Sequence, residues 1–363
     1  MEILKYHILF FMEMIIFHSP FSFFYNGEFA VSIFFVLSGY VLTRSYFING
    51  DDNILVKRVF ARYPRLVIPA LISNILVYLL LKLNLYKIKE LALTNGAEKL
   101  FSYQQLFIFP NALQQMLTSS FFTTWLSNHD YSKMFNLVLW TMTIEFKGSL
   151  LVLAMAFFIK KTKYKILVIF MLSGLFLCFS KTNGIYYIAF LLGLLLASYE
   201  IKVLSTRSNY WVKLGLVISL YLGGYNHDSQ GYFFIFHRFD TFLISLANPG
   251  TVYHVIAATI LIFTVLKSTR IQNFLASPII VYFGHISFPL YLVHQPLIFS
   301  ICSLSFLYTN KTIGYHPSAL LALVILVLVT LPISILSRNT IEQFSIKVSH
   351  EFAKFMLLNS SQD

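Results

Sequence analysis

Three arginines near the start of an apolar segment form the first group of side chains with distinctive chemistry. Arg58, Arg62 and Arg65 are spaced by four and three residues, so on a helix they lie on one face. A guanidinium group binds phosphate oxygens through two parallel hydrogen bonds, and three such groups suit a ligand that carries phosphates. Positive charge that only sets membrane topology, or that binds lipid headgroups, explains the cluster equally well. These residues alone leave the three interpretations open.

A carboxylate forms the second candidate group. The run Trp140-Thr141-Met142-Thr143-Ile144-Glu145 places this acid where an apolar segment begins. If Glu145 faces the interior of a helical bundle, the loss of water favours its protonated form and suits it to proton handling. The alternative is that Glu145 pairs with Lys147 or stays in contact with solvent.

Histidine, proline and tyrosine gather in the third group, from His285 to Pro296. Because proline removes a backbone hydrogen bond, this run predicts a kinked, polar helix. The polar density favours a functional role for Tyr291 and His294 about as much as a structural role in the core.

The fourth group runs from Asn26 to Tyr40. Gly27 permits a tight turn, and the small pair Ser38-Gly39 allows another helix to approach closely. On physical grounds alone, a turn followed by a helix-packing face is the favoured interpretation.

Membrane-spanning helices must position these groups. The chain has 363 residues, of which 57% are apolar or aromatic and 12% are charged, whereas a soluble domain carries about 25% charged residues. The mean hydropathy is +0.72, and a soluble fold has no interior large enough to bury that much apolar surface. The sequence therefore predicts an all-α polytopic membrane protein.

Apolar runs of the length needed to cross a bilayer, roughly 20 residues, predict about ten transmembrane helices in one bundle. They lie at 5–20, 28–47, 64–83, 143–159, 164–180, 184–200, 210–224, 251–267, 280–302 and 317–336. We expect a membrane domain over residues 1–340 and a short cytoplasmic tail over 341–363. The segment 232–246 is aromatic but contains charged residues, so we expect it at the membrane interface.

The net charge of +12 arises from 27 basic and 15 acidic residues. The basic residues stand in short loops between apolar runs, so topology explains the excess and we expect no nucleic-acid partner. Placing most of them in the cytoplasm puts both termini there. This orientation predicts the arginine cluster at the inner face and Glu145 near the outer face. Neither an H-E-x-x-H motif nor a Cys/His cluster occurs, so the sequence predicts no metal site.

Taken in order, the four groups resemble the motifs of the integral-membrane acyltransferase family 3, whose members O-acylate envelope and exported polysaccharides. The matches are Gly27–Tyr40 (family wording roughly G-x-x-GV-x-x-FFVLSG), the basic stretch Arg58–Pro69, Trp140–Glu145 (W-[ST]-[LM]-x-x-E) and Ser287–Pro296 (S-x-x-[LI]-YL-x-H-x-P). The resemblance spans about residues 18–340. Each motif alone is weak, but four in this order with ten spans are specific.

The resemblance implies an O-acyltransferase of the inner cell membrane. An acyl group, typically acetyl, passes from acyl-CoA on the cytoplasmic side to a hydroxyl of a surface polysaccharide or glycolipid, with acyl-CoA as co-substrate and no bound cofactor. Membrane lipids are the other expected partners. The implied catalytic residues are His18, Glu145 and His294, the implied donor-binding residues are Arg58, Arg62 and Arg65, and the implied pocket residues are Tyr291, Trp140 and Ser38.

The first span departs from the family pattern of an arginine followed, about ten residues later, by a histidine. His18 matches the histidine, and His7 stands where the arginine belongs. A histidine suits the role of general base because free imidazole titrates near neutrality. The alternative is that His18-Ser19-Pro20 is a later loop and that the true first span is truncated.

Two other functions remain open at this stage. The missing arginine favours an inactive relative of the family with a scaffolding role. A transporter of lipid-linked glycans is the other, and inverted repeats or paired broken helices in the two halves would favour it. We see neither pattern in the sequence.

Overall fold

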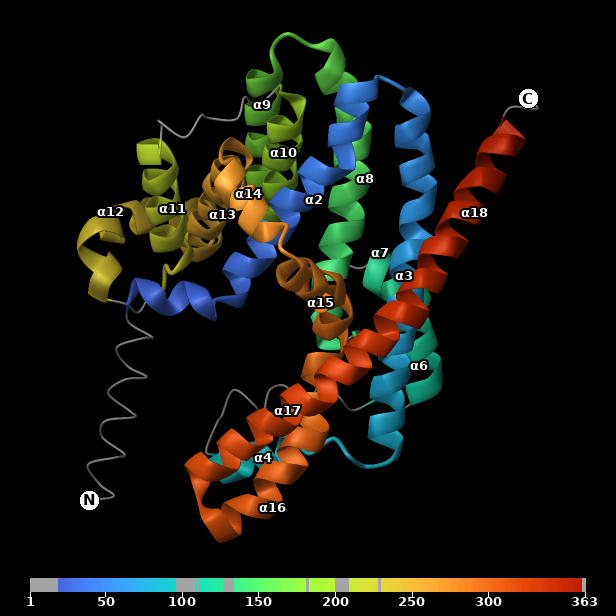
Figure 1. Ribbon diagram of the computed structural model, residues 1–363, viewed down its shortest axis with the longest axis vertical. Coiled ribbons are helices and arrows are strands. Elements are labelled where there is room, and N and C mark those ends of the chain that lie inside the picture. Colours follow the sequence, from blue (N-terminus) through green and yellow to red (C-terminus); the bar gives the residue numbers. More distant parts are fainter. Residues whose placement is uncertain are drawn as a thin grey trace. The chain divides into compact units, whose positions relative to one another are not determined.

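A computed structural model of the chain describes residues 19–95, 109, 111–126, 134–180, 183–199, 209–227 and 230–360. Over these residues the regular structure is helical and includes no strand (Figure 1). The all-α fold predicted from the sequence is therefore confirmed. The first predicted span, 5–20, lies almost entirely outside the described residues.

Nine of the ten predicted spans coincide with apolar helices in the described part of the chain. Six of these helices are long and apolar enough to cross a bilayer: Gly27–Asn49, Asp52–Lys82, Leu137–Lys161, Pro249–Lys267, Pro278–Ile313 and Tyr315–Leu358. Three shorter ones are Lys165–Phe179, Gly184–Ser198 and Tyr210–Gly223. The polytopic membrane architecture is therefore confirmed.

The chain forms two compact units. Unit 1 comprises Met1–Val56 and Gly148–Ala276. Its described helical segments are η1 (Pro20–Phe24), α2 (Gly27–Asn49), the later turns of α8 (Trp140–Lys161), α9 (Lys165–Phe179), α10 (Gly184–Ser198), α11 (Asn209–Gly223), α12 (Gln230–Leu246), α13 (Pro249–Lys267) and α14 (Thr269–Leu275). In this unit α10 packs along α2, and α13 contacts both α2 and α11.

Two glycines allow α2 and α10 to touch at their backbones. A Cβ atom at Gly39 would overlap the backbone carbonyl of Phe190, and one at Gly193 would overlap that of Val36. The close helix approach predicted at Ser38-Gly39 is confirmed, and its partner is α10. Lipid tails are as apolar as the helix surfaces, so the hydrophobic effect does not drive two membrane helices together. Van der Waals contact of this kind helps to hold them together instead.

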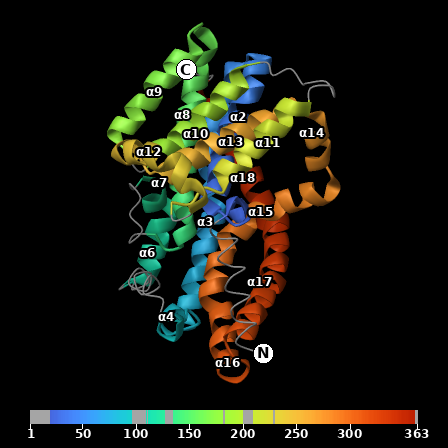
Figure 2. The same cartoon turned by 90° about the vertical axis from the view of Figure 1, so that its left-hand side faces the viewer.

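Unit 2 comprises Lys57–Lys147 and Ser277–Asp363. Its described segments are most of α3 (Asp52–Lys82), α4 (Ile88–Asn95), α6 (Ala112–Thr118), η2 (Ser119–Thr123), α7 (Thr124–Leu126), η4 (Leu137–Leu139), the start of α8, α15 (Pro278–Leu297), η6 (Ile298–Cys302), α16 (Ser303–Ile313), α17 (Tyr315–Ser337), η7 (Arg338–Glu342) and α18 (Gln343–Ser360). α17 packs along both α15 and α16, as Figure 2 shows for α16. A buried apolar cluster from α3, α7, α8 and α15 forms its core.

Helices α17 and α18 continue one another through the π-helical turn η7, from Tyr315 to Leu358 over 44 residues. At about 1.5 Å per residue this helix is roughly 65 Å long, about twice the thickness of a bilayer's hydrocarbon core. Part of the expected tail 341–363 is therefore helical up to Ser360. Its cytoplasmic location stays a prediction, as does the interfacial position of 232–246, which lies within helix α12.

Candidate functional site

A buried ion pair joins α3 to α8 within unit 2. The Arg62 guanidinium donates a hydrogen bond from Nη2 to Oε1 of Glu145, and only 11% and 4% of the two side chains are exposed. An unpaired charge in such surroundings costs several kcal/mol of desolvation, so each residue requires the other. Of the alternatives for Glu145, the interior position is therefore the right one and solvation is wrong.

This contact corrects the predicted depths of the two residues. The sequence placed the arginines at the inner face and Glu145 near the outer face, but side chains that touch lie at one level. The reason is that α3 begins at Asp52 rather than at residue 64. Arg62 is therefore roughly 15 Å along the helix, at about 1.5 Å per residue, instead of in the preceding loop.

The other two arginines gather around the pair. Arg58 is half-buried and Arg65 is exposed, and the charge of Arg62 acts on both of them. Arg65 also lies close enough to Glu145 for their opposite charges to interact. The structure thus brings together the three arginines and the acid that the sequence singled out separately.

A second carboxylate, Glu342 in η7, belongs to the same electrostatic cluster. It interacts with Arg65, Arg338 and His285. The four arginines and two glutamates of this cluster leave an excess of positive charge, which suits an anionic ligand. The sequence analysis missed Glu342 because it follows the last predicted span, 317–336, whereas the helix continues through it.

The residues predicted on α15 meet the start of α8. The Tyr291 hydroxyl lies 2.8 Å from the carbonyl oxygen of Val138 and 2.9 Å from the hydroxyl of Thr141. His294 is half-buried, and its Nδ1 lies 2.7 Å from the carbonyl oxygen of Tyr291. Because a carbonyl only accepts, Nδ1 carries the proton, and Nε2 of the neutral ring is left as a base.

A buried tryptophan that the sequence analysis did not select supports the ion pair. Trp125 is 1% exposed, and its indole N–H donates to the carbonyl of Ser120 at 2.7 Å. Its ring meets Tyr63 and Phe146 edge to face, at centroid distances of 6.1 Å and 5.8 Å. These two aromatic residues directly follow Arg62 and Glu145, so one indole packs against the turns of α3 and α8 that carry the ion pair.

The structure describes two of the three remaining predicted site residues. Trp140 is half-buried at the start of α8, next to Thr141. Ser38 is half-buried on α2 in unit 1 rather than in unit 2. His18 and His7 lie outside the described residues, so the catalytic role implied for His18 stays a prediction.

A comparison with protein families covers most of the chain, including the ion pair and the α15 residues. A family model described as an acyltransferase domain, that of acyltransferase family 3, matches residues 3–338. The chain belongs to acyltransferase family 3. No curated protein and no solved structure matches it.

Membership of acyltransferase family 3 supports a membrane acyltransferase in general terms. The matched region contains the arginines of α3, Glu145 and the α15 residues, and it ends at the first residue of η7. Glu342 and α18 therefore lie beyond the part of this acyltransferase that the family model covers.

Proposed function

We propose that this family member is an O-acyltransferase that moves an acyl group, acetyl in the simplest case, from acyl-CoA to a hydroxyl of a surface polysaccharide or glycolipid. In this proposal the protein lies in the cell membrane with both termini in the cytoplasm. The observation that carries it is the arginine cluster of α3, whose positive charge exceeds the negative charge of the nearby carboxylates.

Donor binding is the role proposed for the arginines. Glu145 holds Arg62 in one orientation, so this guanidinium is positioned before a ligand arrives. Arg58 and Arg65 are more accessible than Arg62 and would bind the phosphates of acyl-CoA. Arg62 would add a fixed positive charge beside them, and it loses little side-chain freedom when the ligand arrives.

Acyl transfer itself needs a base for the acceptor. In the proposed reaction the hydroxyl oxygen attacks the thioester carbonyl, the C–O bond forms and the C–S bond breaks. The hydroxyl proton goes to His18 and then to the leaving thiolate, which departs as free coenzyme A. Glu145 would orient or protonate a partner, and His294 and Tyr291 would line the pocket.

Chemical analysis of surface polysaccharide tests this function. Cells that produce the full chain should carry base-labile ester groups that cells without it lack. Purified full-length protein in lipid nanodiscs should also transfer label from radioactive acetyl-CoA to that polysaccharide. Equal ester content in the two cell lines, together with no transfer in vitro, would refute the proposal.

A further inference from the structure

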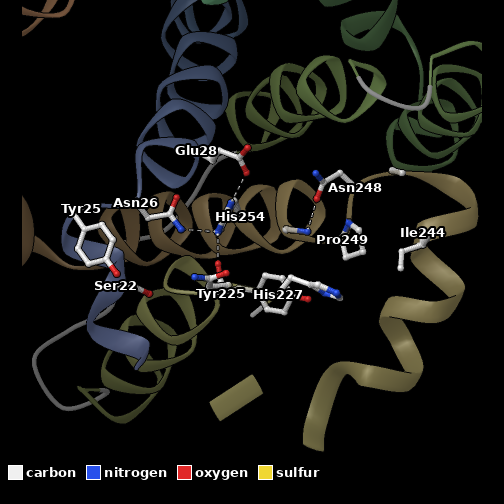
Figure 3. A pocket seen from close by; sticks show the side chains of 13 residues that line it. Ser22, Tyr25, Asn26, Glu28, Tyr225, His227, Ile244, Asn248, Pro249 and His254 are labelled. Carbon is white, nitrogen blue, oxygen red and sulfur yellow. Dashed lines mark hydrogen bonds and ion pairs between the residues drawn. The ribbon is translucent and has the colours of Figure 1, made fainter. Parts of the chain in front are cut away.

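Unit 1 contains a cavity that none of the site residues discussed above lines. Its volume is about 650 Å³, within the range of small-molecule sites, which is roughly 300–1,000 Å³. The walls come from the turn before α2, the loop after α11 and the start of α13 (Figure 3). Polar and aromatic side chains line it together: Ser22, Tyr25, Asn26, Glu28, Tyr225 and His254.

His254 is the buried titratable group in this wall, with 3% of the residue exposed. Its Nε2 lies 3.0 Å from Nδ2 of Asn26 and 3.2 Å from the carbonyl oxygen of Tyr225. The Asn26 side chain cannot be reversed, because its Oδ1 caps α2 by accepting the N–H of Phe29. The Asn26 amide is satisfied when Nε2 of His254 accepts, and the Tyr225 carbonyl is satisfied when Nε2 carries a proton, so these two contacts hold the ring without selecting one tautomer.

The other ring nitrogen, Nδ1, faces a carboxylate. Nδ1 of His254 lies 3.5 Å from Oε2 of Glu28, and 52% of the Glu28 side chain is exposed (Figure 3). Glu28 stands in the first turn of α2, where the helix dipole favours negative charge. The buried imidazole thus lies behind the Glu28 carboxylate at ion-pair distance, while the carboxylate itself lines the cavity.

The neighbouring part of the wall is fixed by a second carboxylate. The Tyr225 hydroxyl donates to Oδ2 of Asp240 at 2.6 Å, and the Tyr253 hydroxyl donates to Oδ1 at 2.9 Å. Burial, together with the Asp240 carboxylate, holds the pKa of the Tyr225 hydroxyl well above its ordinary value. Tyr225 therefore stays a hydrogen-bond donor at physiological pH, and its backbone carbonyl keeps its place beside His254.

We propose that this cavity binds the hydroxyl-bearing acceptor, a neutral sugar, with Glu28 accepting a hydrogen bond from a sugar hydroxyl and His254 positioning Glu28. The identification of the sugar as acyl acceptor rests on the proposed function. An ionised carboxylate is a strong acceptor for an O–H donor. The ring of Tyr25, which is 53% exposed, offers an apolar face to the C–H side of a pyranose.

Saturation-transfer NMR on the full chain in lipid nanodiscs tests the site directly. The probes are the methyl glycosides of glucose, galactose, mannose and N-acetylglucosamine, with ethanolamine as a cationic probe. We expect at least one glycoside to bind, and Glu28→Gln to weaken it roughly tenfold or more, as loss of a charge-assisted bond implies. Glu90→Gln, at an exposed acid on α4, is the matched control and should change nothing.

The site is refuted if no glycoside binds, if Glu28→Gln binds as the native chain does, or if ethanolamine binds in place of the sugars. His254→Gln should weaken glycoside binding too. His254 is buried, so its replacement risks misfolding. The test is therefore decided by Glu28→Gln, because the half-exposed Glu28 side chain can be replaced with less risk to the fold.

Acyl-transfer kinetics separate this inference from the proposed function. Glu28→Gln and His254→Gln should each raise KM for the acceptor and leave KM for acyl-CoA unchanged, a split that general loss of structure would not produce. Glu28-dependent sugar binding without any acyl transfer would overturn the proposed function and leave the sugar site standing. Acyl transfer with an unchanged acceptor KM in Glu28→Gln would overturn the site alone.

Discussion

The Asn136 amide donates a 2.9 Å hydrogen bond to the carbonyl oxygen of Leu292 on α15. This is the oxygen that Pro296, four residues later, leaves without its helical N–H donor. Asn136 is 1% exposed, so its amide supplies the missing bond from within the protein interior. A side chain that precedes α8 therefore completes the backbone of α15 beside the Tyr291 and His294 positions.

Replacement of this amide should destabilise unit 2. Asn136→Leu keeps the approximate volume but leaves the Leu292 carbonyl without a donor, at a cost of about 1–3 kcal/mol. We expect a lower thermal unfolding midpoint in nanodiscs. The exposed Asn53→Leu is the control, and an equal loss in both variants would contradict the argument.

The buried ion pair should show strong coupling in a double-mutant cycle. Glu145→Met and Arg62→Met each leave one buried charge without its partner, and each single change should cost about 3–5 kcal/mol of stability. The double variant Arg62→Met with Glu145→Met removes both charges and should be more stable than either single change. Chemical or thermal unfolding of the four proteins measures this, and additive losses would refute the coupling.

Kinetics with the acyl donor should distinguish specific binding by Arg65 from a general effect of positive charge. Arg65→Ala should raise KM for acyl-CoA about tenfold to a hundredfold, the equivalent of one charge-assisted hydrogen bond. Arg65→Lys should restore only part of it, because lysine cannot make the two-pronged contact. Arg270→Ala, at an exposed position on α14, is the matched control. Unchanged donor kinetics in Arg65→Ala would contradict donor binding by Arg65 and would leave it only a role in setting membrane topology.

The contact between α2 and α10 should not tolerate a methyl group. Gly39→Ala places a Cβ atom against the Phe190 carbonyl, and the forced separation should cost about 1–3 kcal/mol. Gly174→Ala on α9 meets open space and should be neutral or slightly stabilising, because alanine is the better helix former. Thermal midpoints of the two variants give the comparison, and equal behaviour would contradict it.

Alkaline pH should weaken the wall that Tyr225 forms. The pKa of this hydroxyl is raised in the folded chain by burial and by Asp240, so its contribution is complete below the unfolded value of about 10 and is lost as pH rises above it. Tyr225→Phe should lower stability by about 1–3 kcal/mol at pH 8. Its deficit relative to the native chain should shrink between pH 9.5 and 11. A constant deficit across that range would count against the assignment.

The lengths of the apolar runs predicted most of the helices. The candidate site could not be predicted in the same way, because it is formed by contacts between residues far apart in the sequence. The nine matching spans follow from the hydrocarbon thickness that each run must cross. The start of α3 was missed because charged residues within a helix look like a loop until Glu145, 83 residues away in the sequence, supplies a partner. His254 was missed because one histidine in an apolar run shows nothing of the Asn26 and Glu28 side chains that meet it.

The Arg62–Glu145 pair also constrains how the protein is made. A ribosome adding about 5–20 residues per second synthesises Arg62 roughly 4–17 seconds before its partner, which follows 83 residues later. During that interval α3 carries an arginine that costs about 2.5–3.5 kcal/mol at the centre of a bilayer. The apolar residues of α3 can offset this cost, but the helix is least stable in the bilayer until Glu145 arrives, so the order of synthesis becomes part of the folding pathway.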